Sequence, residues 1–189
     1  DGMLCLASCD KSTPGHLMAA GRLDIPTLVL PCGYQPCGVW RGQRVDIEDV
    51  FERTGWLRSE AITIDELKDL ADHAITGPGV CSGMGTATSI HLAAEALGMT
   101  LPGTSAVEAN SSKMWEHVDA SGTRIVELVR EDVRPRSVMT HSAFENATTA
   151  LLAVSGSVNC VKHLQAVAIE AEADVDVYGL FAEYAERVP

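Results

Sequence analysis

The sequence lacks the long apolar runs and the positive charge that mark several classes of protein. No stretch approaches the roughly 18 uninterrupted apolar residues of a membrane span, and the first residues do not resemble a signal peptide. Only 14 Lys and Arg stand against 26 Asp and Glu, which gives a formal net charge of −12. An acidic chain without a basic stripe argues against binding to nucleic acid or to a membrane surface. We therefore expect a cytoplasmic protein.

Several functional motifs are also absent, including Walker A, His-Glu-x-x-His and Cys-x-x-Cys. The six cysteines (5, 9, 32, 37, 81 and 160) lack a secretory signal, so they indicate reduced thiols or metal ligands rather than a disulfide framework. A hydrophobic content of 46% with 21% charged residues argues against disorder. The chain opens at Asp1 without a start Met and stops at Pro189 just after a helical pattern. We expect both ends to be cuts within a longer chain.

The order of apolar segments predicts an α/β fold. Met3–Ala7 is expected to be a buried strand, because it is too apolar for an exposed edge. Pro14 suits the first turn of the next helix, with Ser12 or Thr13 as its cap, and Thr27–Leu30 is a second strand. Strand, helix and strand in succession predict a parallel sheet flanked by helices, a three-layer α/β/α arrangement.

The rest of the chain is predicted to be mainly helical. A capping box formed by Thr63 and Glu66 opens one helix, and Gly98 closes another. A glycine-rich loop at 77–85 separates these two helices. The predicted helices span about 46–55, 63–74, 86–97, 112–131, 142–154, 158–172 and 178–187.

The first candidate for chemistry is the loop Ser8-Cys9-Asp10-Lys11, which follows the first strand. Ligands collect at the carboxyl ends of strands in open parallel sheets. The thiol of Cys9 and the carboxylate of Asp10 are a soft and a hard metal ligand side by side, and a following helix N-terminus favours a thiolate. The alternative is a surface turn in which Asp10 is a cap and Lys11 is solvated.

The second candidate is the glycine-rich loop around Cys81. Its backbone N–H groups could point towards a ligand bound by the Cys81 thiol. Its glycine spacing resembles a dinucleotide fingerprint, but that motif requires a preceding strand, and residues 72–76 are poor strand material. The alternative is a tight turn with an inert cysteine.

Other residues carry weaker signals. Cys32 and Cys37 could join Cys5 and Cys9 in a zinc site, although Cys5 and Cys160 are better explained as core residues. Residues 155–159 could bind an anion through backbone N–H groups or could simply cap a helix. The remaining candidates, His91 and His163, are interpreted as helix-face residues rather than ligands.

Taken together, these segments resemble the dihydroxy-acid dehydratase and phosphogluconate dehydratase family, which includes sugar-acid dehydratases. Order and spacing agree over nearly the whole chain. The matching stretches are SCDKSTPG at 8–15, LMAA at 17–20, GVCSGMGTA at 79–87, EALGMTLPG at 95–103, FENA at 144–147 and GSVN at 156–159. The resemblance implies part of the N-terminal domain of a two-domain enzyme whose C-terminal β-barrel is absent from this chain.

The resemblance also implies a reaction and its cofactors. The family converts 2,3-dihydroxy acids to 2-oxo acids, using an iron–sulfur cluster (2Fe-2S or 4Fe-4S) and Mg²⁺. Cys9 and Cys81 match cluster ligands, and Asp10 matches a Mg²⁺ ligand. Lys11 matches a carboxylated lysine that binds Mg²⁺, and Ser157 and Asn159 are the implied substrate-binding residues. A cluster iron can act as Lewis acid on the leaving hydroxyl, while Mg²⁺ grips the carboxylate end.

The departures from the family pattern define further expectations. A third cluster cysteine and another acidic ligand lie upstream in the family, and its serine base lies in the barrel, so this chain alone is expected to be inactive. The Gly-Gly-Pro-Met segment that usually follows the second strand in the family is replaced here by residues 31–38. Because this loop is expected to line the pocket, the replacement bears on which substrate is bound. A non-catalytic metal-binding or scaffold domain is the alternative function. We expect a homo-oligomer.

Two geometric predictions follow. The loops of Cys9 and Cys81 should meet at the carboxyl edge of the sheet. The side chain of Lys11 should point into the same cavity as Cys9, away from bulk solvent, because a desolvated amine captures CO₂ more readily.

Overall fold

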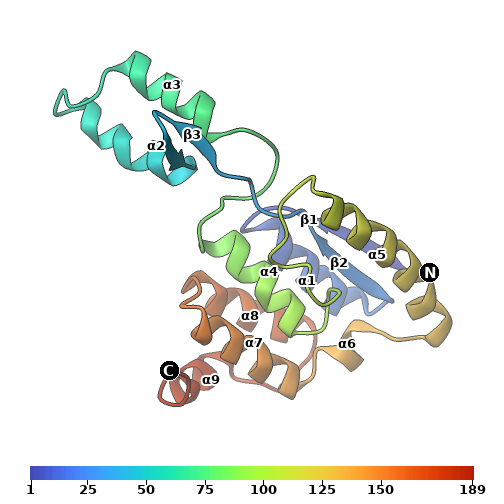
Figure 1. The fold of residues 1–189 in the computed structure, drawn as a ribbon. Helices are drawn as coiled ribbons and strands as arrows, with labels where there is room; N and C mark the ends of the chain where they lie inside the picture. Colours follow the sequence, from blue (N-terminus) through green and yellow to red (C-terminus); the bar gives the residue numbers. More distant parts are fainter.

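A two-stranded parallel sheet lies in the larger of two lobes, as the computed structural model of residues 1–189 shows (Figure 1). Strand β1 (Met3–Ala7) pairs with β2 (Thr27–Pro31), and helix α1 (Ser12–Leu23) connects them. The register runs from Met3 opposite Thr27 to Ala7 opposite Pro31. The predicted strand–helix–strand unit is confirmed.

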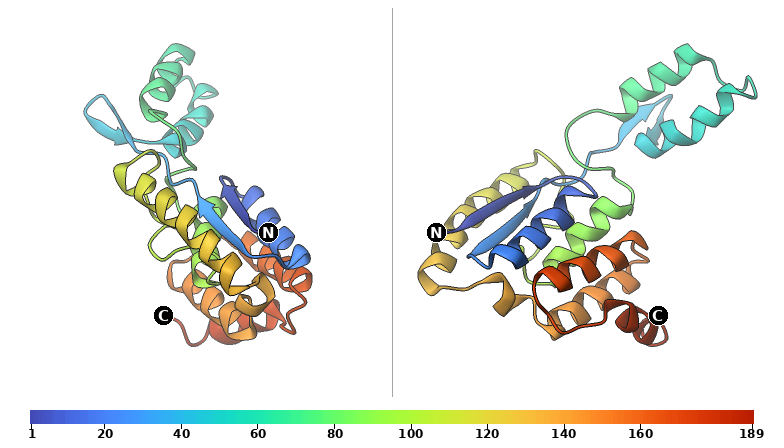
Figure 2. Two further views of the ribbon diagram at one scale, coloured as in Figure 1. Left: turned by 90° about the vertical axis from the view of Figure 1, so that its right-hand side faces the viewer. Right: turned by 180° about the vertical axis from the view of Figure 1, so that it is seen from behind.

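Helices cover both faces of this sheet. In the left view of Figure 2, α5 (Ser112–Glu131) lies on one side of the strands and α1 on the other. The helices α4 (Thr86–Ala96), α7 (His141–Ala153) and α8 (Asn159–Glu170) share a core with α1 and the sheet. Two short helices, α6 (Pro135–Val138) and α9 (Val177–Tyr184), complete this lobe. The predicted α/β class, with a parallel sheet flanked by helices, is confirmed.

The main hydrophobic core lies between the sheet and the helices α1, α4, α7 and α8. Phe144 is its largest fully buried side chain. Cys5 and Cys160 belong to this core, as predicted, and burial raises the pKa of the Cys160 thiol to about 12. These two cysteines are therefore inert packing residues.

Strand β1 is the edge of the sheet in this chain, because β2 is its only partner strand. Leu6, near its end, is 69% exposed. The prediction of a fully buried strand is therefore wrong: the residues of β1 alternate between the core, which takes Cys5 and Ala7, and the opposite face, where Leu6 lies.

The second lobe projects from the first and has a core of its own (Figure 1). It contains the hairpin β3 (Gly38–Trp40) and β4 (Gln43–Val45), helix α2 (Ile47–Thr54), the 3₁₀ turn η1 (Gly55–Leu57) and α3 (Ile64–Ala74). Its core consists of Val45, Ile62, Leu67, Leu70 and Ala74. Both helices are predicted from the sequence, but the hairpin is not.

The two strands of that hairpin have only three residues each, which is too few for apolar alternation to show in a sequence. A two-residue turn joins them, and both of its residues, Arg41 and Gly42, have positive φ. That backbone suits the twist of a hairpin, but Arg at its first position is not the usual sequence signal.

Helix boundaries follow their local capping signals closely. The hydroxyl of Thr63 accepts a hydrogen bond from the Glu66 N–H at 3.2 Å, and the Glu66 carboxylate accepts one from the Thr63 N–H at 3.1 Å. This is the predicted capping box. None of the helices is both long enough and apolar enough to cross a bilayer.

Candidate metal and substrate site

The loop carrying Cys9 leaves the carboxyl end of β1 and is held by one hydroxyl. Ser12 accepts hydrogen bonds from the backbone N–H groups of Cys9, at 2.9 Å, and Ser8, at 3.2 Å. Ser12 was expected to cap α1, as was Thr13, but Lys11 occupies the cap position without a side-chain bond. The Ser12 hydroxyl instead fixes the loop from inside the first turn, and Cys9 is left exposed.

The next two residues form an ion pair beside a histidine. The Lys11 ammonium lies 3.2 Å from the Asp10 carboxylate and 3.4 Å from Nε2 of His163 on α8. The hydrogen bond from Lys11 lowers the pKa of Asp10, and burial, followed by the charge of Lys11, lowers the pKa of His163. The Lys11 side chain is 64% exposed. The prediction that it points away from bulk solvent is therefore wrong for this chain, although an acidic neighbour is present.

The loop carrying Cys81 pairs with the segment that leaves the carboxyl end of β2. The Val80 N–H donates to the Gly33 carbonyl at 3.0 Å, and the Gln35 N–H donates to the Val80 carbonyl at 2.8 Å. Cys81 is exposed, as Cys9 is. Because β1 and β2 are parallel, both cysteine loops lie at the same edge of the sheet.

Two glycines allow neighbouring segments to approach residues 33–35 closely: Gly79 admits the Cys81 loop, and Gly33 admits residues 107–109. Gly33 has φ of +82°, and a Cβ there would lie 2.7 Å from the Val107 carbonyl oxygen. Gly79 has φ of +128°, and its Cβ would collide with the backbone of Gln35. Both positions need a residue without a side chain.

A strand before the glycine-rich loop is missing, since α3 ends at Ala74 and no strand follows it. The dinucleotide-binding alternative required that strand. The structure therefore argues against it.

Residues from two distant parts of the chain meet at the N-terminus of α4. The Thr86 and Ser157 hydroxyls lie 2.8 Å apart, and the Asn159 amide donates to the Thr86 hydroxyl at 3.1 Å. The Ser157 N–H donates to the Ser89 hydroxyl at 2.9 Å. The Ser157 hydroxyl also accepts a hydrogen bond from the Asn159 N–H at 3.4 Å, and its carbonyl accepts one from the Cys160 N–H at 2.9 Å. Ser157 therefore caps the start of α8, as the helix-capping explanation of residues 155–159 predicts.

This polar network is continuous with both loops. Thr86 follows the Cys81 loop directly, and His163, which contacts Lys11, lies one turn after Asn159 on α8. The second lobe also reaches the Cys81 loop, because Ser82 donates to the Asp46 carboxylate at 2.8 Å. Helix α8 thus links the two groups of predicted site residues, since Asn159 contacts Thr86 and His163 contacts Lys11.

Two of the residues that carried weaker signals in the sequence, Cys32 and His91, lie beside the loop of Cys9. The half-buried Cys32 follows β2, and its thiol donates to the Ser8 carbonyl at 3.8 Å. His91, predicted to be a helix-face residue, is 1% exposed, and burial lowers its pKa to about 4. It also hydrogen-bonds the backbone of Ser8. Only the folded chain reveals these neighbours, because neither residue lies in a recognisable motif.

No three His, Cys, Asp or Glu side chains of this chain are grouped so as to hold a metal ion among themselves. The zinc site suggested for Cys5, Cys9, Cys32 and Cys37 is therefore not formed, and Cys5 is in the core. The donors that the loops present are separate from one another.

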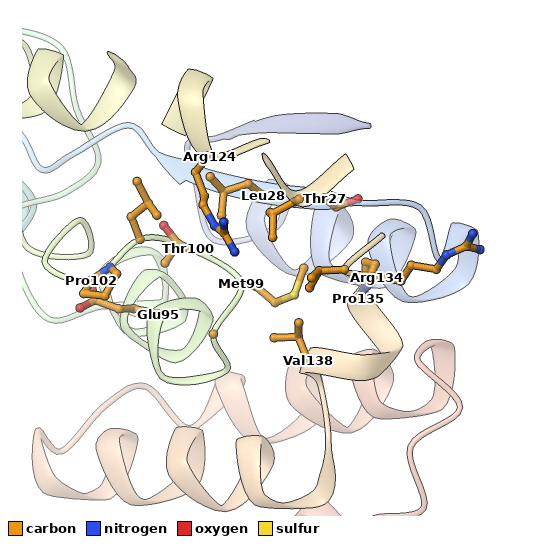
Figure 3. A pocket seen from close by; sticks show the side chains of 14 residues that line it. Thr27, Leu28, Glu95, Met99, Thr100, Pro102, Arg124, Arg134, Pro135 and Val138 are labelled. Carbon is orange, nitrogen blue, oxygen red and sulfur yellow. The ribbon is translucent and has the colours of Figure 1, made fainter. Parts of the chain in front are cut away.

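A cavity of about 320 Å³ lies elsewhere, by the start of β2 (Figure 3). It is bordered by Thr27, Met99 and Glu95. The Glu95 carboxylate accepts hydrogen bonds from the N–H groups of Gly103 and Ser105 at 2.7 and 2.9 Å. Arg124, also at this cavity, is paired with Glu127 and Glu131. The charges at this cavity are thus already paired within the chain, and the cavity is at the opposite end of β2 from the cysteine loops.

Known proteins match this chain along its whole length. The family described as "Dihydroxy-acid/6-phosphogluconate dehydratase N-terminal" matches residues 1–189. A protein of Syntrophobacter fumaroxidans named dihydroxy-acid dehydratase is 42% identical over 189 residues, which are all of this chain and 34% of that protein. One of Methanothermobacter thermautotrophicus, with the same name, is 40% identical over all of this chain and 34% of that protein.

A third relative agrees with these two. A protein of Sulfurisphaera tokodaii, also named dihydroxy-acid dehydratase, is 40% identical over 90% of this chain and 30% of its own length. The chain thus spans about a third of the length of the curated relatives it matches. With its cysteine loops and their polar surroundings at one edge of a parallel sheet, the chain belongs to the dihydroxy-acid/6-phosphogluconate dehydratase family and corresponds to its N-terminal part.

Proposed function

We propose that this chain is part of a hydro-lyase that converts a 2,3-dihydroxy carboxylic acid or sugar acid into the 2-oxo-3-deoxy acid. One observation carries the proposal: the loop of Cys81 pairs with the segment that follows β2, at the sheet edge where the loop of Cys9 follows β1, and it leads into Thr86, which bonds Ser157 and Asn159. Relatives named dihydroxy-acid dehydratase support the same reaction class.

The donor types suit the two cofactors that the resemblance implies. Cys9 and Cys81 are exposed thiols, and their sulfurs are the ligands that iron–sulfur clusters take. Asp10 adds a carboxylate that is 43% exposed, the hard oxygen ligand that Mg²⁺ prefers. When bound, the cluster and Mg²⁺ would supply Lewis-acid help for the leaving hydroxyl and charge compensation for the acid.

Lys11 is proposed to bind Mg²⁺ after carboxylation of its amine. Asp10 and His163 hold the amine in place from two sides, at 3.2 and 3.4 Å. Only the neutral amine reacts with CO₂, so the Lys11 ammonium would first lose a proton to water and a second proton would leave as the carbamate forms. The exposed position leaves the amine open to dissolved CO₂, although it does not provide the desolvation expected from the sequence. A carboxylated Lys11 would present an anionic oxygen beside the Asp10 carboxylate, and both are hard ligands.

The polar groups around the start of α4 are proposed to hold the substrate. Ser157 and Asn159 offer a hydroxyl and an amide, which can hydrogen-bond the hydroxyl and carboxylate groups of a hydroxy acid. Thr86, which bonds both, fixes their orientation. Such preorganised groups position a flexible, polyhydroxylated chain for elimination.

The test uses the full-length protein that contains this chain, purified without oxygen. Release of 2-oxo acid from a panel of sugar acids and dihydroxy acids is measured together with iron content. Cys81→Ser should lose the iron and the dehydration together. Cys37→Ser, at another exposed cysteine, is the matched control and should keep both.

Full dehydration by an iron-free, Mg²⁺-loaded preparation would rule out the role given to the cluster. Retention of iron by Cys81→Ser would rule out the ligand role of that residue. If iron is bound but no acid of the panel releases a 2-oxo product, the scaffold alternative replaces the enzyme.

A further inference from the structure

Cys32 lies next to the loop of Cys9, although 23 positions separate the two in the sequence. The Cys32 N–H donates to the Ala7 carbonyl at 2.9 Å, which extends the pairing of β1 and β2 by one residue. The Cys32 thiol donates to the Ser8 carbonyl at 3.8 Å. Since that carbonyl carbon is bonded to the nitrogen of Cys9, the Cys32 sulfur lies one peptide unit from Cys9.

The spacing of the strands suits a disulfide at this position. Pro31 lies opposite Ala7, so Cys32 lies opposite Ser8, and Cys9 is its diagonal neighbour. A strand spacing of about 4.8 Å combined with a rise of about 3.3 Å per residue would place the two Cα atoms about 5.8 Å apart, within the roughly 4.4–6.8 Å that a disulfide bridges. Burial raises the pKa of the Cys32 thiol, and the charge of the neighbouring Cys9 raises it further.

Both sulfurs can be reached from solvent. Cys9 is exposed, and Cys32 borders a surface groove of about 380 Å³ between the sheet and α5. The other cysteines are less suited to pair with Cys9. Cys5 and Cys160 are in the core, and Cys37 lies beyond the turn that follows β2. Cys81 is exposed, but the backbone of its loop pairs with residues 33–35 and not with the loop of Cys9.

We propose that Cys9 and Cys32 form an intramolecular disulfide when the metal-free chain meets a disulfide oxidant such as oxidised glutathione. The exposed Cys9 thiolate attacks one sulfur of the oxidant, forming a mixed disulfide and releasing one reduced glutathione. The Cys32 sulfur then loses its proton to water and attacks the Cys9 sulfur, which releases the second glutathione. The two protein thiols are oxidised by two electrons, and the oxidant is reduced by two.

This disulfide would block Cys9 as a metal ligand. That consequence rests on the proposed function, whereas formation of the bond does not. The Cys9–Cys32 disulfide would thus form when the metal is lost under oxidising conditions, and a reducing thiol would reverse it.

The test treats the reduced, metal-free chain with oxidised glutathione and maps its peptides by mass spectrometry without reduction. The expected product links the peptides of Cys9 and Cys32 and carries no glutathione on Cys9. Cys32→Ser and Cys32→Ala should instead accumulate glutathione on Cys9, while the matched control Cys37→Ser should form the same bond as the unmodified chain. Circular dichroism shows whether each variant is folded, and the two substitutions at Cys32 guard against misfolding of one.

A bond from Cys9 to Cys37 or Cys81, or a stable mixed disulfide in the unmodified chain, would overturn the proposal. Reconstitution of the oxidised full-length protein with iron and sulfide separates the two hypotheses, namely that the disulfide forms and that Cys9 is a metal ligand. If the mapped disulfide forms and iron uptake is unchanged, the disulfide stands and the ligand role of Cys9 fails.

Discussion

Protonation of His91 should destabilise the folded chain as the pH falls below neutrality. The ring is 1% exposed on α4, its Nε2 has no hydrogen-bond partner, and burial lowers its pKa from 6.5 to about 4, against a smaller opposing effect of the Ser8 backbone. Between these two values the unfolded chain binds a proton that the folded chain does not. The contribution of neutral His91 to the unfolding free energy is therefore fully present above about pH 6.5 and is lost as the pH falls towards 4.

The size of this effect follows from the separation of the two pKa values. At about 1.4 kcal/mol for each pH unit, the interval between 6.5 and about 4 corresponds to a loss of roughly 3 kcal/mol. Since single domains are stable by only about 5–15 kcal/mol, this histidine is a large part of the pH dependence in that window.

The assay is urea unfolding of the reduced chain at a series of pH values between about 7 and 4.5. The unfolding free energy of the unmodified chain should fall with pH more steeply than that of His91→Leu, because carboxylate titration is common to both and cancels. His141→Leu, at an exposed position, is the matched control and should follow the unmodified chain. If the His91→Leu profile runs parallel to that of the unmodified chain, the buried neutral imidazole does not control this dependence.

Three further predictions concern the site, the main core and the cap of α3. In the full-length protein, Lys11→Arg should abolish dehydration although it keeps the charge, because a guanidinium cannot form the carbamate; turnover like that of the unmodified enzyme would contradict this role. Phe144→Ala, in the main core, should cost about 3–5 kcal/mol in urea unfolding, whereas Phe51→Ala, at a 65% exposed position, should change stability by less than about 0.5 kcal/mol. Thr63→Ala should cost about 1 kcal/mol by removing the cap of α3, seen as faster hydrogen exchange there, and equal exchange in both proteins would show that the capping box is dispensable.

Features set by neighbouring residues could be predicted from the sequence. The capping box of Thr63 and Glu66 lies within one turn, and the predicted helix at 112–131 has the bounds of α5. The strands β1 and β2 were evident from short apolar runs bounded by turn residues. The core positions of Cys5 and Cys160 followed from the apolar segments that contain them. In each case the deciding interactions are local or follow from hydrophobic periodicity.

Features set by distant residues needed the folded chain. The hairpin of β3 and β4 is too short to leave a pattern, and the exposure of Leu6 depends on which strands pair with β1. The exposure of Lys11 likewise depends on what covers it in space. The hydroxyl of Ser12 could serve a helix cap or the Cys9 loop, and only the backbone geometry around it determines which.

The candidate site divides in the same way. The sequence by itself determined the residue types, because the motifs around Cys9 and Cys81 and the residues Ser157 and Asn159 are visible in it. The tertiary structure alone decided their neighbours: Thr86 meets Ser157 across 71 positions, Lys11 meets His163 across 152, and Cys32 reaches the loop of Cys9. Side-chain chemistry belongs to each residue, but contacts between distant residues depend on how strands pair and helices pack, and those arrangements are properties of the whole chain.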